Sequence, residues 1–421
     1  MKRKEFLKTS VVAALAMPST AAHLLSHNER WTDLSPEDEA FWSFVRAQFP
    51  LTRDRVYFNT GGLGASPYAV IDAVKAKMDE LEKISETGHT EGLWKEMKTR
   101  AGGFFGCDAD ELAFMRNATE GINVVCNGLP LGEGDEVITT THEHVANAVP
   151  WLALQRRRRI VVKFFEPSTA SAQENIDRVE RLMSTRTRLI SVPHITTTTG
   201  QILPIRHLAD LARARRIWLF VDGAQAAGMI PLNLHELGCD AYAFCGHKWL
   251  LGPKETGYLY VRKDMLDTVQ AKFVGAYSDH GYDFQKGELA FHPSAQRYEY
   301  GTVSVPLRVG LDAALQFLAR IGMTNVWKRD QQLSAYLYNQ LRSIPKIRVL
   351  SPASDSERSA MVTFQHESIP FLKLQAHLNT SNLRTRGVSE GGVNGLRISC
   401  HIYNSREEID RLIEGVKSAR G

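Results

Sequence analysis

The sequence predicts an α/β protein with a large, doubly wound and mostly parallel sheet domain and a smaller α+β domain at the C-terminal end. Two observations predict this class. Between about residues 110 and 260, short β-rich apolar segments alternate with helical segments, which is the pattern of a sheet with helices on both faces. From about residue 306, longer helices lead into a second group of strand segments. The 421 residues are enough for more than one hydrophobic core.

Composition is that of an ordinary globular protein. Hydrophobic residues make up 43% of the chain and charged residues 23%. A net charge of +4 is too small to indicate a nucleic-acid partner, and the basic run at residues 156–159 is interpreted as a solvated helix end. The five cysteines are scattered without a C-x-x-C pair, so neither a disulfide framework nor a zinc site is predicted.

The first 28 residues have the composition of an export signal. They combine a basic start, a short apolar stretch and small residues near Ala22. The segment RKEFLK is similar to the twin-arginine export motif, but Lys4 replaces the second arginine. The apolar stretch is too short to span a membrane. Export to the periplasm and a cytoplasmic location both stay open.

The next part, residues 29–60, is predicted to form a helix and an arm that packs on the small domain. The helix is expected within residues 31–50, with Ser35 as its N-cap and acidic residues in its first turn. The large domain is then expected to cover residues 61–305 and the small domain residues 306–421.

Periodicity and propensity predict the elements of both domains. Residues 67–105 are expected to be helical with a break near Gly88, and residues 203–216 form an amphipathic helix. Apolar, β-rich runs predict strands of the large domain, at residues 111–115, 136–141, 159–165, 188–195, 217–222 and 258–261. In the small domain we expect helices at residues 306–322, 326–343, 370–379 and 405–419, with strands at residues 347–351, 361–365, 383–387 and 396–400.

Lys248 lies on a tight turn between two predicted strands. The run AYAF precedes it, and turn-forming glycines at 252 and 257 separate it from YLYV. A lysine in this place suits an enzyme that forms a Schiff base with a carbonyl group. Taken alone, a His-Lys pair is more often simply solvated.

Asp222 is the residue that supports a catalytic interpretation of Lys248. It ends the apolar run IWLFV, which is typical of a buried parallel strand. Ligands bind at the carboxyl ends of strands in open α/β sheets. A lysine can hold the aldehyde of pyridoxal phosphate as an imine, and an aspartate can keep the ring nitrogen protonated, so that the ring withdraws electrons. Asp222 and Lys248 therefore predict this cofactor.

Six motifs resemble those of the class V aminotransferase family of pyridoxal-phosphate enzymes, which includes cysteine desulfurases and isopenicillin N epimerase-like proteins. They follow one another in family order and cover most of the chain after about residue 55. They are NATEGIN (117–123), EHVAN (143–147), VDGAQA (221–226), GHKWLLGP (246–253), EYGT (299–302) and LRISCHIYNSREEID (396–410). The resemblance implies the fold of the type I pyridoxal-phosphate transferases.

The resemblance also implies which residues hold the cofactor ring. His144, directly after the glutamate of EHVAN, would lie flat on the ring. Gln225 would contact the phenolic oxygen beside the imine. Thr197 stands where many relatives have an asparagine for the same oxygen, and a threonine donates that bond with a shorter reach.

A second group of residues is assigned to the phosphate. The helix after ELAFM is expected to start at Thr119, and the free N–H groups of a helix N-terminus bind phosphate well. Thr119, with the backbone around Ala118, is therefore a phosphate ligand or simply an N-cap. The resemblance adds His247, and also Cys245, which stands where relatives usually have serine and which donates more weakly. Thr302 would reach the phosphate of a neighbouring subunit, which implies a homodimer.

Substrate contacts come from two segments. Arg397 stands where relatives hold the α-carboxylate of the substrate, and a guanidinium matches a carboxylate with two hydrogen bonds. The loop VYFNTGGLGASP borders the substrate pocket in the family, and Asn59 within it is assigned to the substrate. Arg384 and Arg386 lie nearby in the sequence, and either one could face the pocket.

The reaction stays open between several possibilities. Our first expectation is an enzyme acting at the α-carbon of an amino acid, an aminotransferase or an isopenicillin N epimerase-like enzyme. The alternative is a C–S lyase or cysteine desulfurase-like enzyme, and a non-catalytic cofactor-binding module is a third. A cysteine desulfurase needs a thiol on the loop RTRGVSEGGVNG, which has no cysteine, and Cys400 is expected to be a buried strand residue. We therefore expect no protein-bound persulfide.

Overall fold

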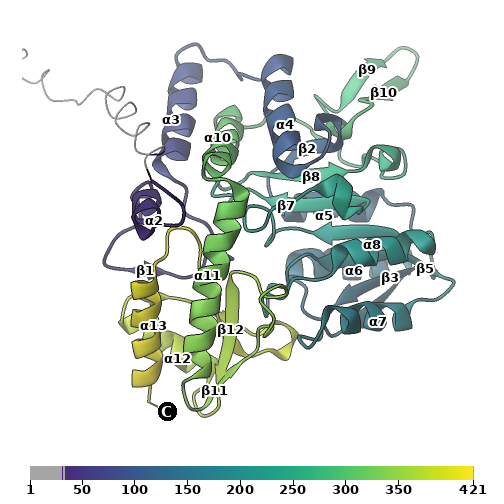
Figure 1. Cartoon of the computed structure of the whole chain (residues 1–421). Coiled ribbons are helices and arrows are strands. Elements are labelled where there is room, and N and C mark those ends of the chain that lie inside the picture. Colours follow the sequence, from purple (N-terminus) through teal and green to yellow (C-terminus); the bar gives the residue numbers. More distant parts are fainter. Residues whose placement is uncertain (1–30, 32–33, 421) are drawn as a thin grey trace, which may run out of the picture. The chain divides into compact units, whose positions relative to one another are not determined.

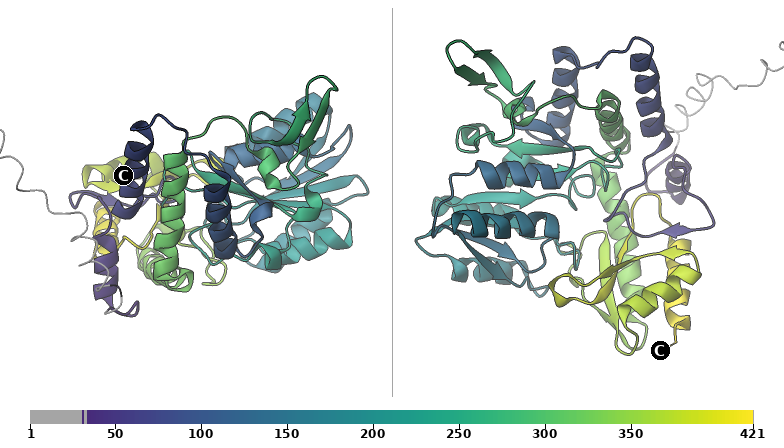
Figure 2. Two further views of the ribbon diagram at one scale, coloured as in Figure 1. Left: turned by 90° about the horizontal axis from the view of Figure 1, so that it is seen from above. Right: turned by 180° about the vertical axis from the view of Figure 1, so that it is seen from behind.

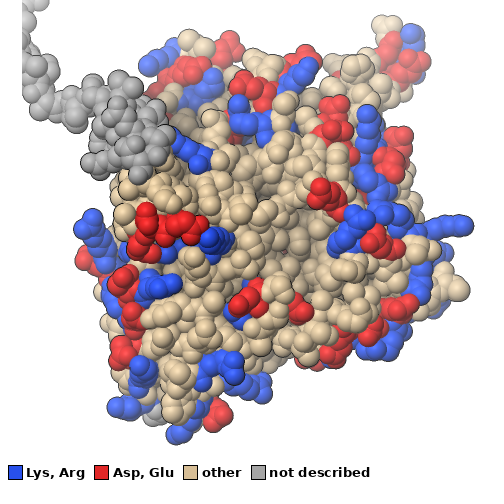
Figure 3. All heavy atoms as spheres, viewed as in Figure 1, with Lys and Arg blue, Asp and Glu red and all other residues tan. Residues whose placement is uncertain are grey.

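The structure is a computed structural model that describes Trp31 and residues 34–420. The predicted export segment lies outside the described residues, so the location of the protein stays a prediction. No helix in the described part of the chain is long and apolar enough to cross a membrane. Figure 3 shows acidic and basic side chains intermingled over one face, in keeping with the small net charge.

The described residues up to Ala47 form a unit of their own, and residues 48–420 form the second unit. The first unit holds helix α2 (Glu39–Arg46). This helix begins later than expected, and its N-cap is Asp38 instead of Ser35. The reason is a turn ahead of the helix, closed by a bond from the Asp38 N–H to the Ser35 carbonyl.

The large domain is built on a seven-stranded sheet in the order β2-β8-β7-β6-β5-β3-β4 (Figure 1). Both pairings of β8 are antiparallel, and the pairings among the other strands are parallel. The strands are β2 (Leu112–Met115), β3 (Glu136–Thr140), β4 (Val161–Phe165), β5 (Thr187–Pro193), β6 (Trp218–Asp222), β7 (Ala241–Cys245) and β8 (Gly257–Val261). The predicted mostly parallel sheet is confirmed.

Helices cover both faces of this sheet (Figure 2). They are α4 (Glu91–Phe105), α5 (Ala118–Gly128), α6 (Val145–Arg158), α7 (Ala172–Leu182), α8 (Ile205–Ala214) and the short α9 (Leu234–Leu237), while α3 (Tyr68–Glu82) packs on α10 (Val305–Ile321). The apolar core beneath α5 and α6 includes the fully buried Trp151 and Ile122. Because strands β2, β3, β5, β6 and β7 run in one direction, their carboxyl ends meet at one edge, and the loops after them form the site.

The small domain has a four-stranded antiparallel sheet in the order β11-β12-β15-β14. Its strands are β11 (Ile347–Val349), β12 (Met361–His366), β14 (Arg386–Val388) and β15 (Gly395–Ser399), and β1 (Val56–Tyr57) pairs separately with β13 (Leu383–Arg384). Its helices are α11 (Met323–Arg342), α12 (Phe371–Thr380) and α13 (Arg406–Ser418). Helix α10 (Val305–Ile321) precedes them and packs against α3 and α4.

One element had no sequence signal. Strands β9 (Asp279–Asp283) and β10 (Glu288–Phe291) form an antiparallel hairpin that projects from the domain at the upper right of Figure 1. The Asp283 carboxylate accepts the N–H groups of Gln285 and Lys286 and so shapes the turn.

Candidate active site

A cavity of about 230 Å³ lies at the carboxyl edge of the large sheet. Most of the residues assigned from the sequence line it: Ala118, Thr119, His144, Thr197, Asp222, Gln225, Cys245, His247, Lys248 and Arg397. Asn59 lies behind the lining, where its Oδ1 accepts a hydrogen bond from Arg397 Nη2 at 3.4 Å. Thr302 is exposed and lies outside this cavity, so its contact with a second subunit, and the homodimer, stay predictions.

The lysine is fixed by the close approach of two other chain segments. Gly64 donates its N–H to the His247 carbonyl at 2.8 Å, and a Cβ at position 64 would lie 1.9 Å from the Lys248 carbonyl oxygen. On another side, Gly228 has φ +90° and presses on the peptide between Trp249 and Leu250. Side chains at these two glycines would displace the turn. The Lys248 backbone is therefore held in one place while its amine faces the cavity.

Asp222 is buried at the end of β6, where its Oδ1 accepts the Ala224 N–H at 2.9 Å. Burial raises the pKa of this carboxyl, and Lys248 acts in the opposite direction. An ionised carboxylate in such a place needs a positive partner. A protonated pyridine nitrogen supplies that charge, so the residue fits the ring of pyridoxal phosphate.

Glu143 is a cavity residue that the sequence reasoning missed. It is buried, and its two oxygens accept the His144 N–H and the Asn147 amide, each at 2.8 Å. Burial, followed by the charge of Asp222, holds the pKa of Glu143 well above its usual range. Its position two residues after the predicted strand 136–141 and inside the EHVAN motif was the signal that could have identified it.

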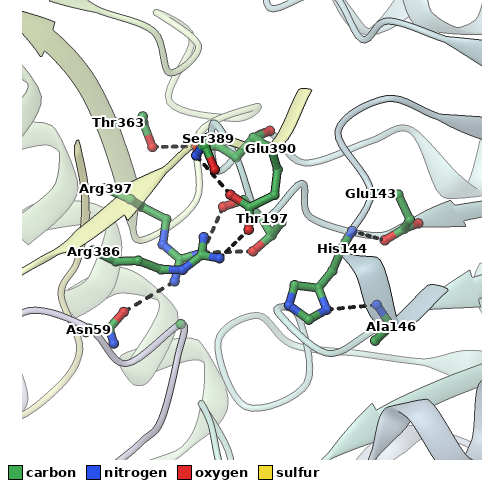
Figure 4. Close-up of polar contacts among 12 residues, drawn as sticks. Asn59, Glu143, His144, Ala146, Thr197, Thr363, Arg386, Ser389, Glu390 and Arg397 are labelled. Carbon is green, nitrogen blue, oxygen red and sulfur yellow. Dashed lines mark hydrogen bonds and ion pairs between the residues drawn. The ribbon is translucent and has the colours of Figure 1, made fainter. Parts of the chain in front are cut away.

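His144 is the N-cap of α6, and its Nδ1 accepts the Ala146 N–H at 3.2 Å (Figure 4). The ring proton therefore sits on Nε2. Burial, together with the nearby Lys248, lowers the pKa of His144 to about 4. A neutral imidazole at neutral pH can stack on a cationic pyridine ring without repulsion, which fits the role implied by the resemblance.

The phosphate end differs from the prediction in one detail. Helix α5 begins at Ala118, and its N-cap is Asn117, whose Oδ1 accepts the Glu120 N–H at 3.0 Å. Thr119 is thus not the N-cap and lies in the first turn. Nearby, the buried Nδ1 of His247 has no hydrogen-bond partner among the described residues. Free N–H groups and an unpaired imidazole nitrogen suit an anion such as phosphate.

Cys245 also lines the cavity. Its thiol lies 3.9 Å from the Ala224 carbonyl oxygen. Burial raises the pKa of Cys245, so the sulfur stays protonated and can act only as a weak donor.

Arg397, on β15, is fully buried and also lines the cavity. Its Nη1 donates to the carbonyl oxygen and to the hydroxyl of Thr197, at 2.7 and 2.8 Å (Figure 4). Burial, and then the charge of Arg386, lower the pKa of Arg397 to about 9, so it is charged at neutral pH. Its Nε has no hydrogen-bond partner within the described part of the chain. A carboxylate ligand fits this group.

The choice between the two neighbouring arginines is clear in the structure. Arg386 lines the cavity and forms an ion pair with Glu390 (Figure 4). Arg384 is absent from the lining and donates to the Thr385 carbonyl at 2.9 Å.

We expect Arg397→Lys to raise KM for amino-acid substrates about 10- to 100-fold and to change kcat less. An ammonium group cannot reproduce the two parallel bonds of a guanidinium to a carboxylate, and a charge-assisted bond contributes roughly 1.5–3 kcal/mol. Steady-state kinetics measure the effect, with Arg384→Lys as the matched control. An unchanged KM with a reduced kcat would remove Arg397 from carboxylate binding.

Comparison with known proteins shows which family the chain resembles. The family model described as Aminotransferase class-V matches residues 65–412. A cysteine desulfurase of Haloferax volcanii is 28% identical over 392 residues, covering 88% of this chain and 90% of that protein. A probable cysteine desulfurase of Staphylococcus aureus is 30% identical over 324 residues, covering 74% of this chain and 77% of that protein.

Solved structures are similar over almost the whole chain. The cystine C–S lyase C-DES in complex with its reaction product cysteine persulfide has a TM-score of 0.82 at 28% identity, with 88% of this chain and 99% of that chain covered. A mutant of C-DES with glycine covalently linked to its pyridoxal-phosphate cofactor also has a TM-score of 0.82. The cysteine desulfurase CsdA of Escherichia coli, at 24% identity and a TM-score of 0.80, supports the fold.

These relatives confirm the expected fold and pyridoxal 5'-phosphate as the cofactor. Their names favour the C–S lyase or desulfurase alternative over our first expectation of an aminotransferase or epimerase. From the family model and the cavity together, the chain belongs to the class V aminotransferase family of pyridoxal-phosphate enzymes.

Proposed function

We propose that the protein is a C–S lyase that cleaves the Cβ–S bond of a cystine-like amino acid and releases the sulfur as a small-molecule persulfide. One observation carries this proposal: no cysteine thiol of the chain is placed to receive sulfur. The loop between β14 and β15, where a desulfurase needs its thiol, instead carries Glu390, paired with Arg386.

The five cysteines support this assignment. Cys245 is the cysteine that lines the cavity, and burial keeps its thiol protonated. Cys400 is fully buried in the core of the small domain, and burial holds its pKa well above the usual range. Burial also raises the pKa values of Cys107, Cys126 and Cys239. A protonated, enclosed thiol is a poor nucleophile.

The cavity also offers a place for the far end of a long substrate. Arg386 and Glu390 put a cation and an anion beside one another near Arg397 (Figure 4). The Nη1 of Arg386 is buried and has no hydrogen-bond partner among the residues that the structure describes. The second ammonium and carboxylate groups of a cystine-like molecule match this pair in charge. The solved complex of C-DES with cysteine persulfide makes that class of substrate a chemical precedent.

The chain's own groups account for the reaction. Arg397 and Asn59 would orient the α-carboxylate, and Asp222 and His144 would hold the cofactor ring in place. When bound, pyridoxal phosphate withdraws electrons from the α-carbon. The amine of Lys248 then takes the α-proton as a general base. The Cβ–S bond breaks with its electron pair passing to sulfur, and water converts the three-carbon remainder to pyruvate and ammonia.

We expect the loaded enzyme to form pyruvate from cystine, with the persulfide in the small-molecule fraction. A coupled assay measures pyruvate, and cyanolysis after gel filtration measures where the persulfide is. Cys107→Ser, which changes the one half-buried cysteine, is the control and should behave as the unaltered chain. Alanine formed from cysteine with persulfide on the protein would identify a desulfurase. Keto-acid exchange or inversion at the α-carbon would restore our first expectation.

A further inference from the structure

The residue after the lysine is held from two sides. Trp249 is fully buried, and its indole Nε1 donates to Gln225 Oε1 at 2.8 Å. Its carbonyl oxygen accepts a hydrogen bond from His401 Nε2 at 3.2 Å. The rings of Trp249 and His401 meet edge to face, with centroids 5.1 Å apart. The backbone next to Lys248 is thus bound by a side chain from the segment that follows β15.

His401 is itself paired with a carboxyl group. Its Nδ1 lies 3.0 and 3.2 Å from the two oxygens of Asp330, which is on α11, and both side chains are fully buried. A carbonyl oxygen can only accept, so Nε2 carries a hydrogen. Nδ1 and the Asp330 carboxyl share a second proton, because an unprotonated nitrogen facing a carboxylate would repel it. The pair therefore holds two protons and is neutral overall, which suits its buried position.

From Trp249 the hydrogen bonds continue across the cavity. Gln225 Nε2 donates to the Gly61 carbonyl at 2.9 Å and reaches the Thr197 hydroxyl at 3.4 Å. That hydroxyl also accepts from Arg397 Nη1. The chain of contacts thus joins α11, the peptide beside the lysine, and the arginine at the carboxylate end.

We propose that His401 is a positioning residue: with Asp330, it holds the Trp249 carbonyl and so fixes the turn from which Lys248 reaches the cofactor. This inference rests on Lys248 as the cofactor lysine, as in the proposed function, and does not depend on which bond of the substrate is cleaved. Displacement of a catalytic group by about 1 Å is enough to reduce rates about 100-fold.

Two substitutions at one position separate the two hydrogen bonds. His401→Gln places an amide nitrogen where Nε2 lies and keeps the donor toward Trp249. His401→Asn places its amide nitrogen where Nδ1 lies, so it keeps the bond to Asp330 and loses the bond to Trp249. Helical and sheet structure is otherwise untouched, since the residue lies in a loop.

In the apoprotein, we expect His401→Asn to speed hydrogen exchange at the Leu251 and Gly252 amides, which close the lysine turn, by about tenfold. His401→Gln should stay within about threefold of the unaltered chain. In the loaded protein, the circular dichroism of the bound cofactor should weaken in the asparagine variant and be retained in the glutamine variant. Should the asparagine variant fail to fold, Asp330→Asn, which keeps the ring but removes the carboxylate, is expected to show the same changes in smaller measure.

Leu412→Ala is the control for general loss of stability. Leu412 is fully buried in the core of the small domain and is not part of the hydrogen-bonded chain. When Leu412→Ala lowers thermal stability as much as His401→Asn does, it should leave the hydrogen-exchange rates of the turn amides and the circular dichroism of the bound cofactor unchanged. The inference is overturned if this control alters them as much as His401→Asn does, or if the glutamine variant is no better than the asparagine variant. Exchange in the apoprotein needs neither cofactor nor substrate, so failure here is distinct from failure of the proposed function.

Discussion

Lys248→Ala should abolish both turnover and the absorbance band of the lysine-bound cofactor. The side chain has two tasks, since it holds the aldehyde and then moves the α-proton, and loss of general acid–base catalysis alone costs about 10²–10⁴-fold in rate. Among the described residues that line the cavity, Lys248 is the only lysine. The other cations there, Arg386 and Arg397, cannot form the covalent link, so no neighbour can replace it.

Borohydride reduction followed by digestion tests the assignment directly. The reduced cofactor should be recovered on the peptide that contains Lys248 and should be absent from the alanine variant. Lys254→Ala is the matched control, because Lys254 is exposed on the same connection between β7 and β8 and is not in the cavity lining. Label on another lysine, or none at all, would end the interpretation of this site.

The centre of this site could be predicted from the sequence because each strand is recognisable from its own short run of residues. Asp222 ends one apolar strand and Lys248 follows the next one, and the carboxyl ends of parallel strands lie at one edge. Arg397 is different: it lies 200 positions from its partner Thr197. Only the resemblance to a family could predict that Arg397 lines the cavity, because nothing in its own segment indicates which side chains it contacts.

Other features could not be predicted because they depend on tertiary contacts that leave no pattern in the sequence. Strand β9 of the hairpin, DHGYD, has mixed polar and glycine residues without hydrophobic alternation, and the Asp283 carboxylate shapes the turn that joins it to β10. Asn117, and not Thr119, is the N-cap of α5, because the Asn117 side chain accepts a hydrogen bond from the Glu120 N–H. Both residue types are good caps, so propensity could not rank them. The sequence around His401 gives no sign of a special role, because its partners Asp330 and Trp249 are distant in the chain.

The second large effect is expected at Asp222. Asp222→Ala should lower kcat/KM by about 10²–10⁴-fold, which corresponds to roughly 3–5 kcal/mol, because removing one member of a buried charge pair leaves the other uncompensated. Asp222→Asn should lose nearly as much. The amide keeps the shape and can still accept the Ala224 N–H, but it cannot hold a positive charge on the ring nitrogen.

Glu143 does not offer a substitute for Asp222, although it is a second buried carboxyl in the same cavity. Its oxygens are already bound by the His144 N–H and the Asn147 amide. Asp240→Asn is the matched control, since Asp240 precedes β7, accepts the Leu219 N–H at 2.6 Å and pairs with Arg262 at 2.7 Å, far from the cofactor in its contacts. Asp240→Asn should lower the stability of the protein and leave kcat/KM unchanged. If Asp222→Asn instead kept full activity, the charge at position 222 would have no part in the chemistry, and the electron-withdrawing role of the ring would need another source.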